Sequence, residues 1–282
     1  MKLQDLVKKY DISFKKALGQ NLLLDDNINR IMVDAAALTP DDYVIEVGPG
    51  LGALTHHMAP KVGKLLAVEI DRAFVPCLLD QFGEMPNVTV FRGDILNHSV
   101  PKLVNEYIPG GTTYKLVSNL PYYITTPILF HFWESPLAFE RLVIMVQEEV
   151  ADRMNAAVNA DNYGVLSLAS RLYGQVDIVH RVPASCFVPR PKVDSCIVRL
   201  RKHKTPLYPE VEPMFIMRLI RAAFTQRRKT LRNSLIKSGQ FGAPESAILE
   251  GMEAAGIDPQ RRPQTLSLAE FATMAREIRS RF

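Results

Sequence analysis

Five short apolar segments alternate with helical patterns along the first half of the chain, and no other feature restricts the fold as strongly. Each segment is rich in β-branched residues and nearly continuous in apolar character, which is typical of strands covered on both faces. Parallel strands need a crossover between them, usually a helix. The alternation therefore predicts an α/β fold with a parallel, doubly wound sheet. The predicted strands are residues 43–47, 65–69, 88–91, 115–118 and 142–146.

The later part of the chain has a different pattern. Strands are predicted at residues 176–179 and 195–200. Because the segment between them is too short for a helical crossover, we expect an antiparallel pair at the sheet edge. A linker with three prolines follows at residues 202–213, and helical patterns then begin near Glu212, Lys229, Pro244 and Ser267. The sequence thus predicts one α/β domain over residues 1–204 and a small all-helical domain over residues 205–282.

Composition excludes several classes of protein. The chain of 282 residues is 47% hydrophobic and 23% charged, which is typical of a globular protein. The N-terminus lacks the apolar core of a signal peptide, and no apolar run reaches the ~18 residues of a membrane helix. The three cysteines, Cys77, Cys186 and Cys196, are scattered and odd in number, which favours buried thiols over disulfides or zinc ligands. We therefore expect a cytoplasmic protein without a membrane or a metal.

Positive charge is concentrated toward the C-terminus. Residues 1–184 hold 16 Lys and Arg against 21 Asp and Glu, whereas residues 185–282 hold 18 against 9. From Arg218 to Arg232 there are six basic residues and no acidic one, and helical spacing would place Arg221, Arg228 and Arg232 along one side. A solvated helix face explains such a run without any ligand. The alternative is a polyanionic partner such as the backbone of a folded RNA.

Polar residues are expected at the ends of four successive strands. Glu46 precedes a glycine loop with Gly48, Glu69 ends the second strand, Asp94 follows the third and Asn119 ends the fourth. In open α/β sheets ligands bind at this edge, and a carboxylate at the second strand can accept the hydroxyls of a ribose. The glycine spacing is Gly-x-Gly-x-Gly, which differs from the Gly-x-Gly-x-x-Gly of pyrophosphate sites. Helix capping is the simpler explanation for any one of these carboxylates.

Asn119-Leu120-Pro121-Tyr122 is the most distinctive motif. The Asn side chain offers a donor and an acceptor, and the tyrosine offers a flat face for stacking. Pro121 favours an extended Leu120, which could turn a backbone carbonyl outward. Together these groups could hold a planar ring that bears an exocyclic amine. A strand-to-helix turn is the plain alternative, since Asn and Pro are common in turns.

With these motifs the sequence resembles the small-subunit (16S) ribosomal RNA adenine dimethyltransferases, the KsgA family. The likeness runs from Phe14 to the C-terminus, with Leu22 where the family usually has Phe, a change expected to alter packing under the cofactor. The matching segments are residues 14–23 as the N-terminal cofactor motif, 46–52 as the glycine loop, 119–122 as the catalytic motif, 187–193 as the target-base motif and 224–233 as the opening of the helical domain.

The resemblance implies a Rossmann-like methyltransferase sheet, a helical RNA-binding domain and S-adenosylmethionine as cofactor. It implies cofactor contacts from Asn21, Leu23, Gly48, Glu69, Asp94 and Asn119. Asn119 and the Leu120 carbonyl would accept hydrogen bonds from the target amine, and Tyr122 and Phe187 would sandwich the adenine. The family adds two methyls to each of two adjacent adenosines near the RNA's 3′ end. The implied partners are the small ribosomal subunit and its RNA, bound by a monomer through Arg221, Arg228, Lys229 and Arg232.

Three other functions compete with this one. The related large-subunit RNA methyltransferases that confer macrolide resistance share the fold, but the long basic helical region from Phe224 favours the small-subunit type. A nicotinamide-dependent oxidoreductase would explain the sheet and Glu69, yet it fits neither the glycine spacing nor Phe187. A ribosome-assembly factor whose binding matters more than its chemistry is the non-enzymatic alternative, and the intact catalytic motif does not exclude it.

Overall fold

The computed structural model describes residues 3–12, 21–23, 25–226, 228–237, 239 and 241–281. The chain forms two compact units, which we call the N-terminal and the C-terminal unit. The N-terminal unit comprises Met1–Ala151 and Asp177–Lys202, and the C-terminal unit comprises Asp152–Val176 and His203–Phe282. The expected boundary after residue 204 lies close to the break after Lys202, whereas the grouping of residues 152–176 with the C-terminal helices was not expected.

A seven-stranded sheet runs through the N-terminal unit in the order β4-β3-β2-β5-β6-β9-β7. The first five strands in this order pair in parallel, which confirms the predicted α/β fold. β9 pairs antiparallel with β6, and β7 lies beside it at the edge, where the late strands were expected. The strands are β2 (Tyr43–Val47), β3 (Lys64–Glu69), β4 (Val88–Arg92), β5 (Tyr114–Asn119), β6 (Phe139–Gln147), β7 (Gly174–Val182) and β9 (Ser195–Lys202).

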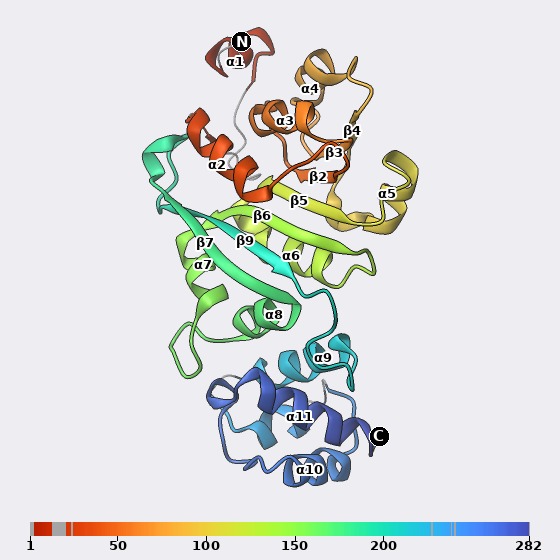
Figure 1. Ribbon diagram of the computed structural model, residues 1–282. Helices are drawn as coiled ribbons and strands as arrows, with labels where there is room; N and C mark the ends of the chain where they lie inside the picture. Colours follow the sequence, from red (N-terminus) through yellow and green to blue (C-terminus); the bar gives the residue numbers. More distant parts are fainter. Residues whose placement is uncertain are drawn as a thin grey trace. The chain divides into compact units, whose positions relative to one another are not determined.

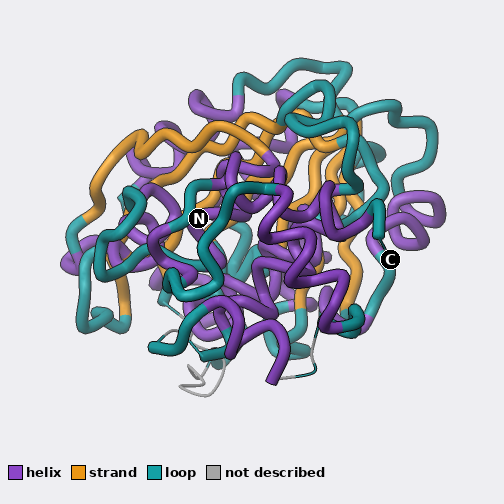
Figure 2. The backbone as a smooth tube through the Cα atoms, turned by 90° about the horizontal axis from the view of Figure 1, so that it is seen from below, coloured by secondary structure: helices purple, strands orange, loops and turns teal. Residues whose placement is uncertain are grey.

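Helices cover both faces of this sheet. Figure 1 shows α2 (Asp26–Ala36), α3 (Ala53–Met58) and α4 (Val75–Phe82) on one side, and α5 (Val100–Tyr107) and α6 (Thr125–Trp133) on the other. In Figure 2 the strands between them are orange and the helices purple. The apolar composition of the central strands β2, β3, β5 and β6 follows from this double coverage, because most of their residues are buried.

The helix α2 provides one wall of the core. Its N-cap is Asp25, whose carboxylate accepts a hydrogen bond from the Asn27 amide. Met32 of α2 is fully buried and belongs to the same core cluster as Met58 of α3 and Val117 of β5. The amphipathic pattern of α2 is thus used to pack the helix against the sheet.

Two short elements join distant parts of the N-terminal unit. The strand β1 (Leu22–Leu23) pairs antiparallel with β8 (Phe187–Val188), and Leu23 lies opposite Phe187. The helix α1 (Leu3–Lys9) packs Leu6 into a small cluster with Leu51 and Phe74. Neither contact could be read from local sequence patterns, since the partners are far apart along the chain.

The C-terminal unit is helical. It contains α8 (Val165–Tyr173), α9 (Pro213–Phe224), a π-helical turn (Asn233–Lys237), α10 (Glu245–Ala254) and α11 (Leu268–Arg279), close to the predicted helix starts. Tyr163 ties the inserted segment to this unit, because its hydroxyl donates a 2.8 Å hydrogen bond to the Leu266 carbonyl. The remaining elements are α7 (Glu148–Asn155) and the 3-10 turns Ala59–Lys61, Ile95–Asn97, Tyr122–Ile124, Ala184–Cys186 and Pro263–Thr265.

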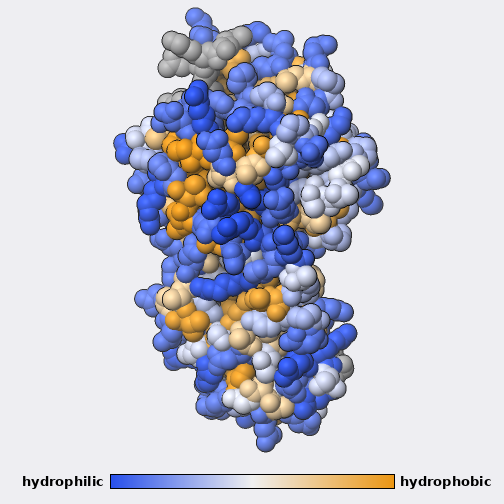
Figure 3. All heavy atoms as spheres, in the orientation of Figure 1, coloured by the Kyte–Doolittle hydropathy of each residue, from blue (hydrophilic) through white to orange (hydrophobic). Residues whose placement is uncertain are grey.

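No helix among the described residues combines the length and the apolar composition needed to cross a bilayer. On the face shown in Figure 3, hydrophobic residues reach the surface in several separate patches among hydrophilic ones.

Candidate active site

A cavity opens at the carboxyl ends of β2, β3 and β5 in the N-terminal unit. About 840 Å³ of empty space lies between its walls when the open solvent at its mouth is counted. The parallel direction of the strands places these ends at one edge of the sheet, where α/β folds bind ligands. The lining residues are Asn21, Leu22, Leu23, Asn29, Glu46, Gly48, Pro49, Gly50, Leu51, Ala53, Leu54, Glu69, Ile70, Phe74, Asn119, Leu120, Pro121, Tyr122 and Tyr123.

The glycine loop between β2 and α3 forms the floor of the cavity. Gly48, Gly50 and Gly52 have φ values of 70°, 60° and 83°, which side chains with a Cβ rarely adopt. At Gly52 a Cβ would also lie 2.5 Å from the ring of Phe82. The loop therefore requires glycine for its own conformation, and Gly48 and Gly50 border the cavity.

Glu69 at the tip of β3 fixes this loop. Its two carboxylate oxygens accept hydrogen bonds from the Gly50 amide at 3.0 Å and from the Asp71 amide at 2.7 Å. The residue is only 3% exposed, and this burial raises its pKa to about 7. A carboxylate in this position is oriented by the backbone and still borders the cavity.

Glu46 is a second buried carboxylate in the cavity wall. It is 1% exposed and accepts a 2.6 Å hydrogen bond from the Thr55 hydroxyl, and burial raises its pKa to about 8. The lining includes two carboxylates and, among the described residues, no Lys, Arg or His. Because an ion of opposite charge stabilises buried carboxylates, the cavity favours a ligand that carries positive charge.

The segment from Asn119 to Tyr122 forms the wall next to β5. Pro121 has an extended backbone (φ −59°, ψ 125°), and the Tyr122 hydroxyl hydrogen-bonds to the Ser195 hydroxyl at 2.6 Å, which fixes the ring. Within the part of the chain that the structure describes, the Asn119 side chain has no hydrogen-bonding partner. Its amide is consequently available to a ligand in the cavity.

Comparison with known proteins agrees with this geometry. The sequence pattern of the family described as ribosomal RNA adenine dimethylase matches residues 12–279. The chain belongs to this family. Among the curated members, ribosomal RNA small subunit methyltransferase A of Lysinibacillus sphaericus is 43% identical over 280 residues, covering 98% of this chain and 94% of that protein. The protein of that name from Alkaliphilus metalliredigens is 41% identical and covers 99% and 97%.

Two solved RNA methyltransferase structures are similar in fold to this chain. A dimethyladenosine transferase from Plasmodium falciparum superposes with a TM-score of 0.73 at 25% identity, covering 90% of this chain and 95% of that one. The 23S rRNA methyltransferase ErmE superposes with a TM-score of 0.62, also at 25% identity, covering 92% and 99%. The Rossmann-like methyltransferase fold that the sequence predicted is therefore confirmed.

Eight of the residues proposed for the dimethylase site line the cavity: Asn21, Leu23, Gly48, Glu69, Asn119, Leu120, Pro121 and Tyr122. Leu22, which replaces the family's usual Phe, also lines it, and the space in front of Gly50 is closed by a Leu22 methyl group 3.3 Å from where a Cβ would lie. The part of the N-terminal motif at residues 14–20 lies outside the described residues.

Asp94 is not a lining residue. Its carboxylate accepts hydrogen bonds from the Leu96 amide and the Asn97 side chain, so it caps a 3-10 turn as the simpler explanation proposed. Burial, followed by the charge of the Asp94 carboxylate, raises the pKa of Tyr123, which is a lining residue.

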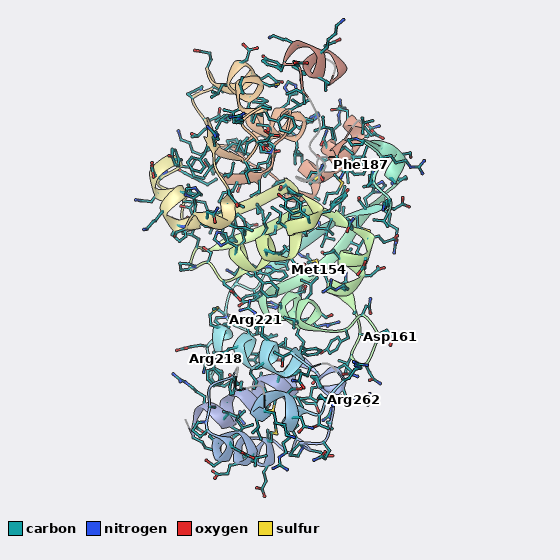
Figure 4. All side chains as sticks on the ribbon, turned by 180° about the vertical axis from the view of Figure 1, so that it is seen from behind. Met154, Asp161, Phe187, Arg218, Arg221 and Arg262 are labelled. Carbon is teal, nitrogen blue, oxygen red and sulfur yellow. The ribbon has the colours of Figure 1, made fainter. Side chains whose placement is uncertain are left out.

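Phe187 does not lie in the cavity either. It is 1% exposed and belongs to the core cluster that contains Ile28 and Val33 of α2 (Figure 4). The expected stacking face is thus covered by apolar side chains in this conformation, whereas the Tyr122 ring borders the cavity. The structure therefore brings Asn119 and Tyr122 together at the cavity. It places Phe187 in the core, opposite Leu23 in the β1–β8 strand pair.

The basic segment differs from the prediction. The helix α9 ends at Phe224, and the described residues between it and Leu231 are not helical, so Arg221, Arg228 and Arg232 do not share one helix side. Arg228 and Lys229 lie exposed in this turn without an ion pair among the described residues. Arg232 forms a 3.4 Å ion pair with Glu245. Arg228 and Lys229 are thus exposed cations in the turn after α9.

Sequence reasoning missed two polar lining residues. Tyr123 is 50% exposed at the cavity, directly after the predicted catalytic motif. Asn29 is 4% exposed and lies on the buried face of α2 with Ile28, Met32 and Val33. An amide within the apolar stripe of an amphipathic helix was the available signal for Asn29.

Proposed function

We propose that this chain transfers methyl groups from S-adenosylmethionine to the exocyclic amines of adenosines in small-subunit (16S) ribosomal RNA. One observation carries the proposal: the Asn119 amide, which no described residue hydrogen-bonds, borders a cavity that also contains two buried carboxylates. Membership of the ribosomal RNA adenine dimethylase family supports the reaction. The curated members named small subunit methyltransferase A support the choice of RNA.

The cavity suits S-adenosylmethionine in charge and shape. The cofactor carries a sulfonium and an ammonium group against one carboxylate, so its net positive charge matches Glu46 and Glu69. Glu69, oriented by two backbone amides, is proposed to accept the ribose hydroxyls, and Asp94 to accept the adenine amine. The glycine loop, together with Asn21 and Leu23, is proposed to hold the amino-acid end of the cofactor.

The proposed chemistry depends on positioning. The sulfonium supplies an electrophilic methyl group and becomes a neutral thioether when the amine has attacked. The Asn119 side-chain oxygen and the Leu120 carbonyl accept hydrogen bonds from the target amine and orient its lone pair. No strong general base is required, because the methylated amine loses its surplus proton readily to water. Orientation of this kind supplies a large share of a rate enhancement.

The target base is proposed to stack on Tyr122, whose ring is fixed by Ser195. A role for Phe187 on the other face of the base requires this residue to leave the core, since it is 1% exposed here. We propose Arg221, Arg228, Lys229 and Arg232 as phosphate contacts of the small ribosomal subunit, bound by a monomer in the cytoplasm. Following the family, the products are two dimethylated adjacent adenosines near the 3′ end.

The decisive test is mass spectrometry of RNA after incubation with the protein and isotopically labelled S-adenosylmethionine. Small subunits that lack the modification should acquire labelled dimethyladenosine. Large subunits in a parallel reaction should remain unlabelled, and label there alone would favour the large-subunit type of enzyme that ErmE represents. Unlabelled adenosines in both reactions would overturn the proposal.

A binding role in ribosome assembly is the second candidate. It is favoured by the exposed cations Arg228 and Lys229, which are not among the residues that line the cavity. The Asn119→Ala variant separates the two roles, because it should lose methyl transfer and keep binding. Restored assembly of small subunits by this variant would establish a function beyond the chemistry.

A further inference from the structure

Asn29 has a buried polar side chain for which the described residues provide no hydrogen bond. It is 4% exposed, lies on α2 between core residues and borders the cavity. None of the described residues forms a hydrogen bond with its side chain. Buried amides are normally paired, so an unpaired one that faces a ligand cavity calls for a ligand.

The position of α2 shows which part of the cavity Asn29 borders. The helix packs against α3 and strands β5, β6 and β9 (Figure 1). In the sheet, β2 separates β5 from β3, and Glu69 lies at the tip of β3. Asn29 therefore borders the cavity on the β5 side of the glycine loop, away from the acceptor proposed for the ribose.

We propose that the Asn29 side chain binds the amino-acid end of S-adenosylmethionine. This inference rests on the proposed function for the identity of the cofactor. If the adenosine part lies over β3, the amino-acid part extends across the glycine loop toward β5 and Asn29. An ammonium needs acceptors and a carboxylate needs donors, and an amide offers both. Since no described lining residue is cationic, the cofactor carboxylate depends on neutral donors such as Asn29.

Calorimetry with two ligands tests this inference. Asn29→Leu removes the amide at similar size, and the matched control is Asn27→Leu, an exposed position on the same helix. S-adenosylmethionine should bind Asn29→Leu roughly tenfold more weakly than wild type, the effect of one lost hydrogen bond. 5′-Methylthioadenosine, which lacks the amino-acid end, should bind both proteins equally. The control should bind both ligands as the wild type does.

Thermal melting of the ligand-free protein distinguishes ligand binding from a role in stabilising the fold. If Asn29 stabilised the fold, its replacement would lower the melting temperature. Since the amide is unpaired without ligand, Asn29→Leu should melt at or above the wild-type temperature and should gain less from added S-adenosylmethionine. A lower melting temperature, an unchanged affinity for S-adenosylmethionine, or an equal loss for both ligands would each overturn the inference. If the wild type binds the cofactor but leaves small-subunit RNA unmodified, the proposed function fails while the assignment of Asn29 stands.

Discussion

The N-terminal unit buries the charges of its cavity, whereas the C-terminal unit exposes its cations at the turn after α9. Glu46 and Glu69 are 1% and 3% exposed, while Arg228 and Lys229 lie at the surface. Burial raises the pKa values of the two carboxylates, and a cationic ligand in the cavity would stabilise their ionised forms. Exposed cations keep their hydration and act through long-range, salt-dependent attraction. The two units are thus suited to a small cation and to a large polyanion.

The two units differ less in net charge than residues 1–184 differ from residues 185–282. The N-terminal unit holds 19 Lys and Arg against 20 Asp and Glu, and the C-terminal unit holds 15 against 10. Arg199 and Arg201, which belong to the basic end of the sequence, lie on β9 and form ion pairs with Asp177. The surplus of positive charge that remains is carried by the helical unit.

Asn119→Ala should have the largest effect of these variants on the rate of methyl transfer, if the N-terminal unit alone catalyses the reaction. Loss of the oriented acceptor should lower the rate of methyl transfer by about 100-fold or more. Binding to small subunits should be unchanged, because the exposed cations remain. The measurement is single-turnover methylation beside particle binding, with Asn27→Ala as the control on an exposed Asn. Turnover near the wild-type rate would show that Asn119 does not position the amine.

Glu69→Ala should weaken S-adenosylmethionine binding by about 1.5–3 kcal/mol, the range for hydrogen bonds to charged groups. It should also lower the melting temperature, since the amides of Gly50 and Asp71 lose their acceptor. Glu69→Gln keeps an acceptor and should lie between the two proteins in both measurements. Calorimetry that finds equal cofactor affinity in all three proteins would remove Glu69 from the site.

Glu46→Gln tests whether the Glu46 carboxyl is buried, because burial makes the free energy of unfolding depend on pH. The pKa of Glu46 is raised to about 8 in the folded protein, so the folded state holds a proton that the unfolded state releases above its lower pKa. The stability contributed by the neutral form is present below about pH 4.5 and is lost as pH rises through about 8. Ligand-free Glu46→Gln should be within about 1 kcal/mol of the wild type at pH 5 and exceed it by on the order of 4 kcal/mol at pH 9. Chemical denaturation at both pH values measures this, and a constant difference would contradict the buried carboxyl.

The smallest effect is expected at the surface of the C-terminal unit. Arg228→Ala combined with Lys229→Ala should flatten the log–log salt dependence of small-subunit binding by roughly 2, one released counterion for each contact. Cofactor affinity should not change. Arg276→Ala, which removes an exposed cation already paired with Glu277, is the matched control and should leave the slope nearly unaltered. Equal slopes in all proteins would mean that the two cations are merely solvated.

Much of the fold follows from local patterns. The strands ending at Glu69 and Asn119 were predictable because a short β-branched run reads as a buried strand wherever it occurs. Their direction follows from the helical crossovers, so the meeting of these tips at one edge was also predictable. The glycine loop was recognisable because its positive φ values demand glycine at fixed positions.

Other features depend on contacts between residues far apart in the chain. Phe187 could pack in the core or stack on a base, and only its pairing with Leu23 and its contacts beneath α2 decided for the core. Residues 152–176 could have completed the N-terminal unit, but Tyr163 packs and hydrogen-bonds with the C-terminal helices.

The sequence by itself determined the strands, the polar residues at their tips and the family, because each depends on residues that are neighbours along the chain or on a motif of fixed spacing. The tertiary structure decided which polar groups are paired and which remain free. Asn29 and Asp94 show why: both are ordinary polar residues in the sequence, yet Asp94 meets two donors in its own turn while Asn29 faces a cavity built by other elements. Hydrogen-bond satisfaction is a property of the assembled packing, to which every neighbouring element contributes.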